Sequence, residues 1–103
     1  MLTHKKFKAR MLEGPAVRTE YERLQPEMEL LDILLSAREE AGLTQAEVAL
    51  RMGTKAPAVA RLGGALASGK HSPSIATIRK YLAACGKKLL VQSEDETKTL
   101  THA

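Results

Sequence analysis

A chain of 103 residues is long enough for one domain with tails and too short for two independent hydrophobic cores. Hydrophobic residues make up 44% of it and aromatic ones only 3%, so the core must be aliphatic, which favours an all-α fold. The single cysteine excludes an internal disulfide, and no run approaches the roughly 18 apolar residues of a membrane span. The N-terminus also lacks the apolar region of a secretory signal, so we expect a cytoplasmic protein with no membrane partner.

The charge is unevenly distributed along the chain. The net charge is +4, but residues 44–88 carry eight basic side chains and one acidic one, whereas residues 26–43 carry one and five. A basic block confined to one structural unit fits a phosphate-facing surface, and hence a nucleic-acid partner. The alternative is that these lysines and arginines form an ordinary solvated face.

Residues 1–25 are expected to form an N-terminal helical arm. A short helix within residues 1–13 is ended by Gly14-Pro15, and Pro15 can open a second helix that runs to about Leu24. The mixed charge of this arm suits docking on a partner. Packing of the two helices on their own domain is an equally good interpretation.

A longer helix is expected from Pro26, which is tolerated in a first helical turn, to Gly42, which suits a C-terminal cap. Arg38, Glu39 and Glu40 are interpreted as its solvated side. Its apolar positions form a wide arc, as a central helix requires. These positions are Met28, Leu31 and Leu35 on one face and Leu30, Leu34, Ala37 and Ala41 on the adjoining one.

Two short helices joined by a tight turn follow. Thr44 and Glu47 form the pattern of a capping box at the start of a helix that runs to Met52. Gly53 suits the turn, because a left-handed backbone costs glycine little, and Thr54 is the candidate cap of the next helix. In these helices Val48, Ala49, Met52, Val59 and Leu62 are expected to point inward. This is the layout of a helix-turn-helix, which places its second helix in the DNA major groove.

The chain beyond Leu62 is expected to begin with a loosened loop. Gly63-Gly64 favours the end of a helix, and the pattern leaves open whether residues 65–67 extend the recognition helix or form a separate turn. A last helix is predicted from Ser74 to about Cys85, with Gly86 as its cap. Its inward stripe should comprise Ile75, Ile78, Leu82 and Cys85.

The C-terminal residues predict an extended segment and a tail. Residues 87–92, with the sequence KKLLVQ, read as a short extended segment that ends the domain of residues 26–92. An exposed apolar strand edge is a liability unless it is paired, so this segment is a candidate for pairing with a symmetry mate. Residues 93–103 are polar and are expected to be disordered.

With these residues in place, the stretch from about Leu30 to Gly86 resembles the Cro/C1-type (XRE) helix-turn-helix family. The pattern of Gln45, Ala49, Gly53, Val59 and Leu62 matches that family's helix pair. More narrowly, several stretches resemble HigA-like antitoxins of toxin-antitoxin pairs: Pro26-Glu27, residues 36–38, 41–48 and 51–54, and residues 70–77. The resemblance implies a five-helix all-α domain, homodimerisation, binding to a double-stranded DNA operator and, often, a partner toxin that cleaves mRNA.

The resemblance also implies roles for individual residues. Gln45, Thr54 and Lys55 would contact phosphates, which fixes the register without reading sequence. Arg61 would read guanine through a bidentate contact, whereas Ala56, Pro57 and Ala58 offer only apolar contact, for example to a thymine methyl. Lys70 and His71 would touch the sugar-phosphate backbone. The family places a glutamate, which braces the domain through a charge pair, where this chain has Gly63-Gly64.

The sequence therefore predicts a DNA-binding repressor, an antitoxin that neutralises its partner toxin and represses its own operon. The alternative is a stand-alone transcriptional regulator, which would have every DNA-binding feature and a purely structural arm. An enzyme is not expected, because the sequence shows no paired carboxylates and no nucleophile with a base. No cofactor is expected either, and His71 is a poor metal ligand, since His4 and His102 lie near opposite termini.

Overall fold

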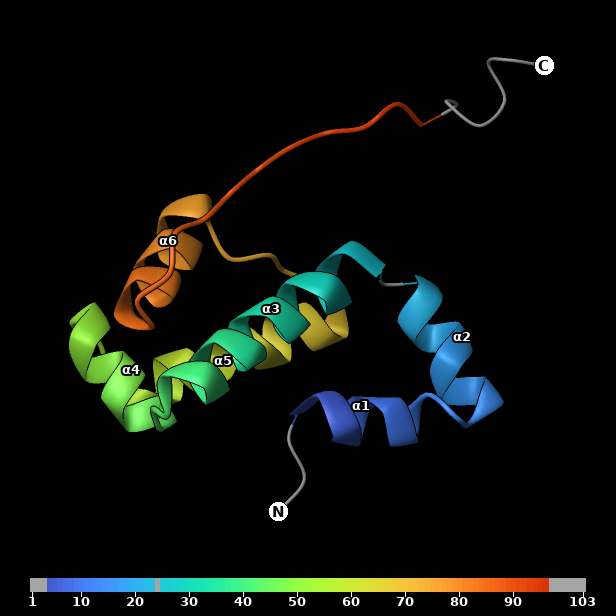
Figure 1. Cartoon of the computed structure of the whole chain (residues 1–103), viewed down its shortest axis with the longest axis horizontal. Coiled ribbons are helices and arrows are strands. Elements are labelled where there is room, and N and C mark those ends of the chain that lie inside the picture. The colour runs from blue at the N-terminus through green and yellow to red at the C-terminus, as the bar shows by residue number, and fades with distance from the viewer. Residues whose placement is uncertain (1–3, 24, 97–103) are drawn as a thin grey trace.

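The computed structural model describes residues 4–23 and 25–96 and is all-helical over that part of the chain. Leu24, expected near the end of the second helix, and residues 97–103 of the expected tail lie outside the described residues. The helices are α1 (His4–Met11), α2 (Pro15–Arg23), α3 (Gln25–Ala41), α4 (Gln45–Met52), α5 (Ala56–Ser68) and α6 (Ile75–Ala84) (Figure 1). Residues 25–96 thus contain four helices, one fewer than the resemblance implies.

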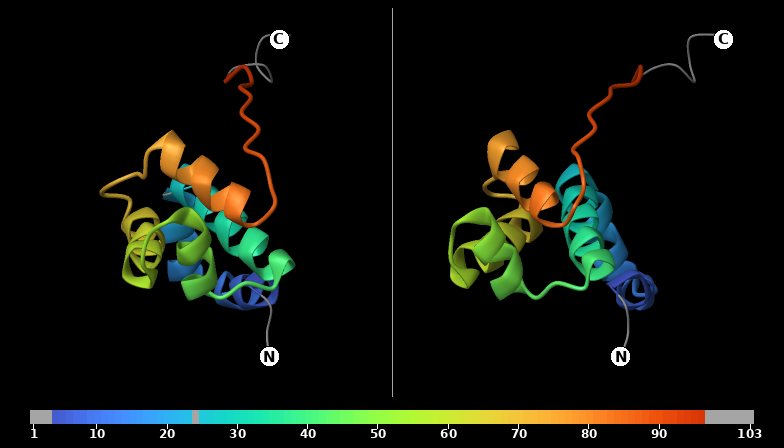
Figure 2. Two further views of the ribbon diagram at one scale, coloured as in Figure 1. Left: turned by 90° about the vertical axis from the view of Figure 1, so that its left-hand side faces the viewer. Right: turned by 60° about the vertical axis from the view of Figure 1, so that its left-hand side comes forward.

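The central helix α3 lies between the arm and α5 (Figure 2). Pro26 stands in its first turn, as predicted, and Leu34 and Ala37 are buried, while Leu30 and Leu31 are half-buried. Ala41 is exposed, because the helix has passed the core at that point. On the other side α3 contacts α1 and α2, and Lys8 of α1 forms an ion pair with Asp32. The arm therefore packs on its own domain.

Arg38 does not belong to the solvated side of α3, as the sequence suggested. It is half-buried, and its Nη1 donates a hydrogen bond of 3.2 Å to the carbonyl oxygen of Leu43, just past the end of the helix. Its positive charge also acts on Tyr81 of α6: burial raises the pKa of the Tyr81 hydroxyl, and Arg38 partly opposes that rise. Glu39 and Glu40 are exposed, as predicted. The difference arises because Arg38 faces the junction of α3, α6 and the α3–α4 turn, which only the tertiary structure creates.

The start and end of α4 are as predicted. Thr44 Oγ1 accepts a hydrogen bond from the Glu47 N–H at 3.1 Å, and the Glu47 carboxylate accepts one from the Thr44 N–H at 2.8 Å. These two bonds form the capping box. Gly53 ends the helix in the left-handed region with φ of 77°.

The start of α5 differs from the prediction by one residue. Thr54 is not its cap, because the Thr54 N–H still donates to the Ala49 carbonyl oxygen at 2.9 Å and so closes the end of α4. Lys55 takes the N-cap position without a side-chain hydrogen bond, and Pro57 lies in the first turn, as expected.

The prediction of a loosened loop at Gly63-Gly64 is wrong, because α5 continues through both glycines to Ser68. Leu66 explains this result: it is 0% exposed and belongs to the core. Burying a leucine contributes about 1.5–3 kcal/mol, which offsets much of the roughly 1 kcal/mol that each glycine costs in a helix interior. The helix ends at Gly69, which has φ of 70°. Residues 65–67 therefore extend the recognition helix.

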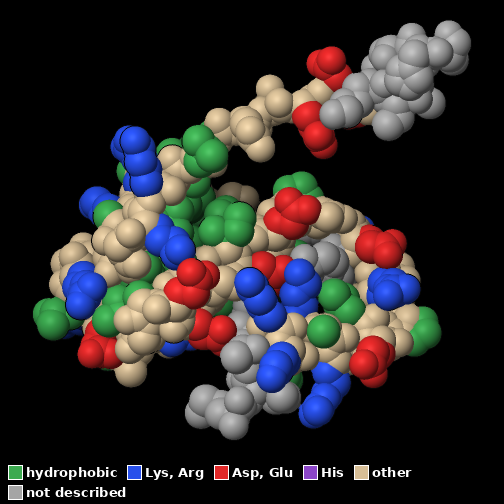
Figure 3. Space-filling model, in the orientation of Figure 1, with side chains coloured by type: hydrophobic (Ala, Val, Ile, Leu, Met, Phe, Trp, Pro, Cys, Tyr) green, Lys and Arg blue, Asp and Glu red, His purple; other side chains and the backbone are tan. Residues whose placement is uncertain are grey.

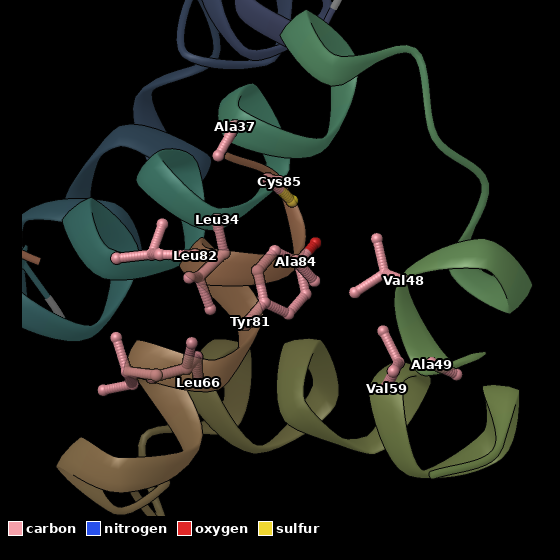
Figure 4. Packing of buried hydrophobic residues seen from close by; sticks show 11 residues of the cluster. Leu34, Ala37, Val48, Ala49, Val59, Leu66, Tyr81, Leu82, Ala84 and Cys85 are labelled. Atoms are coloured by element: carbon pink, nitrogen blue, oxygen red, sulfur yellow. The ribbon is translucent and has the colours of Figure 1, made fainter. Parts of the chain in front are cut away.

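The last helix has the predicted N-cap, but its C-cap is Cys85, one residue before the predicted Gly86, and its inward stripe also differs. The Ser74 side chain accepts a hydrogen bond from the Thr77 N–H, and Gly86 has φ of 76° at the other end. Ile78, Leu82 and Cys85 are buried as expected, but Ile75 is 61% exposed. Tyr81, which was not predicted to point inward, is buried instead and lies in the middle of the core cluster (Figure 4). Ile75 is exposed because it stands in the first turn, beyond the reach of the neighbouring helices.

Candidate nucleic-acid interface

One face of α5 is open to solvent over its whole length. Its exposed residues follow the spacing of three and four that defines one side of a helix: Pro57, Ala60, Arg61, Gly64, Ala67 and Ser68. Arg61 is the only long or charged side chain among them. The arm lies on the opposite side of α3 and leaves this face uncovered (Figure 2). A duplex could approach the helix backbone closely here, with one guanidinium ready to reach base edges.

The N-terminal ends of α4 and α5 carry the other polar residues that the sequence singled out. Gln45 is the first residue of α4 and is exposed. Thr54 and Lys55 are exposed in the turn before α5, whose first turn holds no acidic side chain. The positive end of a helix dipole favours an anion, and Lys55 adds a full charge beside it.

The two alanines expected to reach DNA are less accessible than predicted. Ala56 and Ala58 are half-buried, and Pro57 between them is exposed. Of the three apolar residues assigned to contact bases, only Pro57 therefore stands on the open face. Ala58 instead forms the wall of two shallow grooves along α5.

The first of these grooves brings two predicted residues together. It has a volume of about 290 Å³, and Arg61 and His71 both line it, with Ala65 and Pro73 beneath. Lys70, also exposed, directly precedes His71, and its N–H donates a hydrogen bond of 3.2 Å to Ser68 Oγ. Arg61 and His71 thus line one groove at the side of the recognition helix, with Lys70 next to His71 in the chain.

The second groove contains polar residues that the sequence did not single out as binding residues. It has a volume of about 320 Å³ and is lined by Thr54 from the turn and by Thr77 and Lys80 from α6. The signal was the spacing of three between Thr77 and Lys80, which places both on the side of α6 that faces the α4–α5 turn.

Residues 44–88, which contain the two helices α4 and α5 and the helix α6, carry almost only positive charge. Glu47 is the only acidic residue in positions 44–88. The hydrogen bond from the Thr44 backbone lowers the pKa of its carboxyl, with a smaller contribution from Arg51. Glu47 therefore stays ionised and is committed to the α4 cap. Several Lys and Arg side chains lie at the end of the molecule where α4 and α6 lie, with Asp and Glu side chains among them (Figure 3).

Arg51 fixes the position of α4 relative to α6. Its Nη1 donates a hydrogen bond of 2.9 Å to the carbonyl oxygen of Ala84, in the last turn of α6. The last carbonyls of a helix lack intrahelical partners, so this bond satisfies one of them with a charged donor. It braces the helix pair against the rest of the domain.

The described residues show no other kind of site. In that part of the chain, no three His, Cys, Asp or Glu side chains come together in a way that could hold a metal ion. The side chains of His4 and His102 lie outside it. No helix within residues 4–23 and 25–96 is long and apolar enough to cross a bilayer.

An exposed second helix, a capped first helix and a basic surround define a helical DNA-binding module. Comparison with family models gives the family: the helix-turn-helix model matches residues 34–91, more than half of the chain. The protein therefore belongs to the Cro/C1-type helix-turn-helix family of sequence-specific transcriptional regulators. No curated protein and no solved structure showed a significant match.

Proposed function

We propose that this regulator is an antitoxin: as a homodimer it binds and represses its own operon, and it neutralises a partner toxin that cleaves mRNA. One observation carries the proposal. The open face of α5 and the N-terminal arm lie on opposite sides of α3 (Figure 2), so DNA and a protein partner could be bound at the same time.

The DNA contacts follow from exposure and chemistry. Gln45, Thr54 and Lys55 anchor phosphates beside the starts of α4 and α5, and Lys70 and His71 do so beside the groove. Arg61 reads a guanine O6 and N7, since it is the only side chain of the open face that can form a bidentate contact. Ala56, Pro57 and Ala58 supply apolar surface, of which Pro57 is the most accessible.

The toxin contact is assigned to the arm. Phe7, Met11 and Val17 are large apolar side chains that stay 51%, 44% and 40% exposed on α1 and α2. Exposed basic residues lie around them, among them Lys5 and Arg10. Apolar anchors with a polar rim are typical of a protein interface.

A second candidate is a stand-alone regulator without a toxin. The packing of the arm favours it: α1 and α2 contact α3, and Lys8 and Asp32 form an ion pair. An arm held in this way could serve stability alone.

Two experiments test the proposal. In a titration at fixed salt, Arg61→Ala should weaken binding to the specific operator by roughly 1–3 kcal/mol and leave non-specific binding nearly unchanged. Arg10→Ala, an equal loss of charge on the arm, is the matched control and should leave the operator affinity unchanged. Equal affinities of Arg61→Ala and wild type for the operator would refute the assigned readout.

The toxin assignment is tested by co-purification with the product of the adjacent reading frame. The wild-type chain should bring down this partner, and the double variant Phe7→Ser, Met11→Ser should lose it while keeping operator binding. If operator binding is intact but no partner co-purifies with the wild type, the stand-alone regulator is the correct function.

A further inference from the structure

The segment that follows α6 leaves the domain as an extended strand without a partner. It runs from Lys87 to Glu96 and projects away from the helices (Figures 1 and 2). The Lys87 N–H donates to the Leu82 carbonyl oxygen at 2.7 Å, but residues 88–96 form no backbone–backbone hydrogen bond within the described chain. Leu89 packs against the core, whereas Leu90 and Val91 are 84% and 71% exposed.

We propose that residues 88–94 pair with the same residues of a second copy to form an antiparallel β-ribbon. The inference deepens the proposed function, because it names the interface of the homodimer. An extended backbone with free donors and acceptors is a template for another strand. The segment contains neither proline nor glycine, and its exposed side chains are apolar at the centre. A ribbon of two strands is marginal alone, but Leu89 anchors each strand to its own core.

Charge selects the antiparallel direction. The segment begins with Lys87 and Lys88 and ends with Glu94, Asp95 and Glu96, and acidic side chains are visible at its outer end (Figure 3). Antiparallel pairing brings the basic end of one copy to the acidic end of the other. Parallel pairing would place like charges directly opposite each other, which is unfavourable.

Symmetry and charge together select the register. Hydrogen-bonded and non-hydrogen-bonded pairs alternate along an antiparallel ladder. A two-fold axis between identical strands therefore lies between one residue and the same residue of the second copy. With Val91 at the axis, Lys88 faces Glu94 of the second copy. Lys87, which already contacts Glu40 of its own chain at 3.1 Å, then faces Asp95. The ribbon would hold the two α5 helices in the two-fold relation that a palindromic operator requires.

A charge exchange tests the pairing on the full chain. The wild type should be a dimer in sedimentation equilibrium at low salt. Lys88→Glu and Glu94→Lys should each raise the dimer dissociation constant about tenfold, because two symmetric attractions become repulsions. The double variant Lys88→Glu, Glu94→Lys restores both pairs and should return the constant to near the wild-type value. Lys5→Glu, on α1, is the control and should have no effect. Failure of the double variant to recover would overturn the proposed register.

Cysteine crosslinking tests the axis independently. In a Cys85→Ala background, Val91→Cys should form an intermolecular disulfide under mild oxidation, and Ser93→Cys, nearer the end of the segment, should not. Equal crosslinking of both variants would indicate parallel pairing or random collision and would overturn the proposal. A monomeric wild type that still binds the operator would overturn the ribbon alone, whereas a dimer that binds no operator would refute the proposed function and leave the ribbon intact.

Discussion

Replacing either glycine inside α5 by alanine should stabilise the protein. At Gly64, which is exposed, an added Cβ would meet no atom within 4 Å, so the gain is the difference in helix propensity, about 0.8–1 kcal/mol. At Gly63 the Cβ would lie 3.6 Å from Leu31 Cδ1 on α3, an ordinary van der Waals contact. Gly63→Ala should therefore gain the same amount, with a small further contribution from the buried methyl group.

Thermal unfolding followed by circular dichroism measures the effect. A gain of about 1 kcal/mol should raise the Tm by roughly 4–8 °C in a domain of this size. Gly53→Ala is the matched control: its φ of 77° is left-handed, so a side chain there should cost about 1–2 kcal/mol and lower the Tm. A lower Tm for Gly64→Ala, with Gly53→Ala behaving as expected, would refute a continuous α5.

Four further predictions concern the capping box of α4, the hydrogen bond from Arg51 and the Cys85 thiol. Thr44→Ala should cost about 1 kcal/mol in urea denaturation, because it removes the α4 cap. The hydrogen bond from Thr44 lowers the pKa of Glu47, so its carboxylate stabilises the fold above the ordinary value of 4.5 and loses that contribution as pH falls through the lower folded value. The stability advantage of wild type over Glu47→Gln should accordingly be full at about pH 6 and shrink below about pH 4; an advantage independent of pH would contradict this. Arg51→Leu should cost about 1 kcal/mol in the same assay, since the Ala84 carbonyl loses its charged donor. Burial raises the pKa of the Cys85 thiol, so it should react with a thiol reagent much more slowly in the native protein than in urea, and equal rates would contradict its burial.

Most of the helix ends could be predicted from the sequence to within one residue because their chemistry is local. The capping box of Thr44 and Glu47, the Ser74 cap and the left-handed turns at Gly53 and Gly86 all depend on residues within a few positions of each other. The same holds for the exposed positions of Gln45 and Arg61, which follow from the helical period.

Apart from the one-residue shift at the start of α5, the errors concern residues whose environment is set by distant parts of the chain. Gly63-Gly64 reads as a helix end until Leu66 is placed in the core. Arg38 reads as a surface residue until the α3–α4 turn offers it the Leu43 carbonyl. Tyr81 and Ile75 share a helix, and only the positions of the neighbouring helices decide that the first is buried and the second exposed. Local propensity could not anticipate any of these outcomes, because tertiary contacts outweigh it.

Under the proposed function, in which Arg61 reads guanine, the sparse open face of α5 makes dimerisation a requirement for specificity. One bidentate contact is worth about 1–3 kcal/mol of discrimination, so two copies of Arg61 supply about 2–6 kcal/mol. Specific DNA binding typically exceeds non-specific binding by about 4–10 kcal/mol. A single copy with its one arginine therefore falls short, and two copies reach only the lower part of that range. The remaining discrimination must come from DNA shape, which the small residues of the open face can sense because they let the helix backbone approach the groove closely.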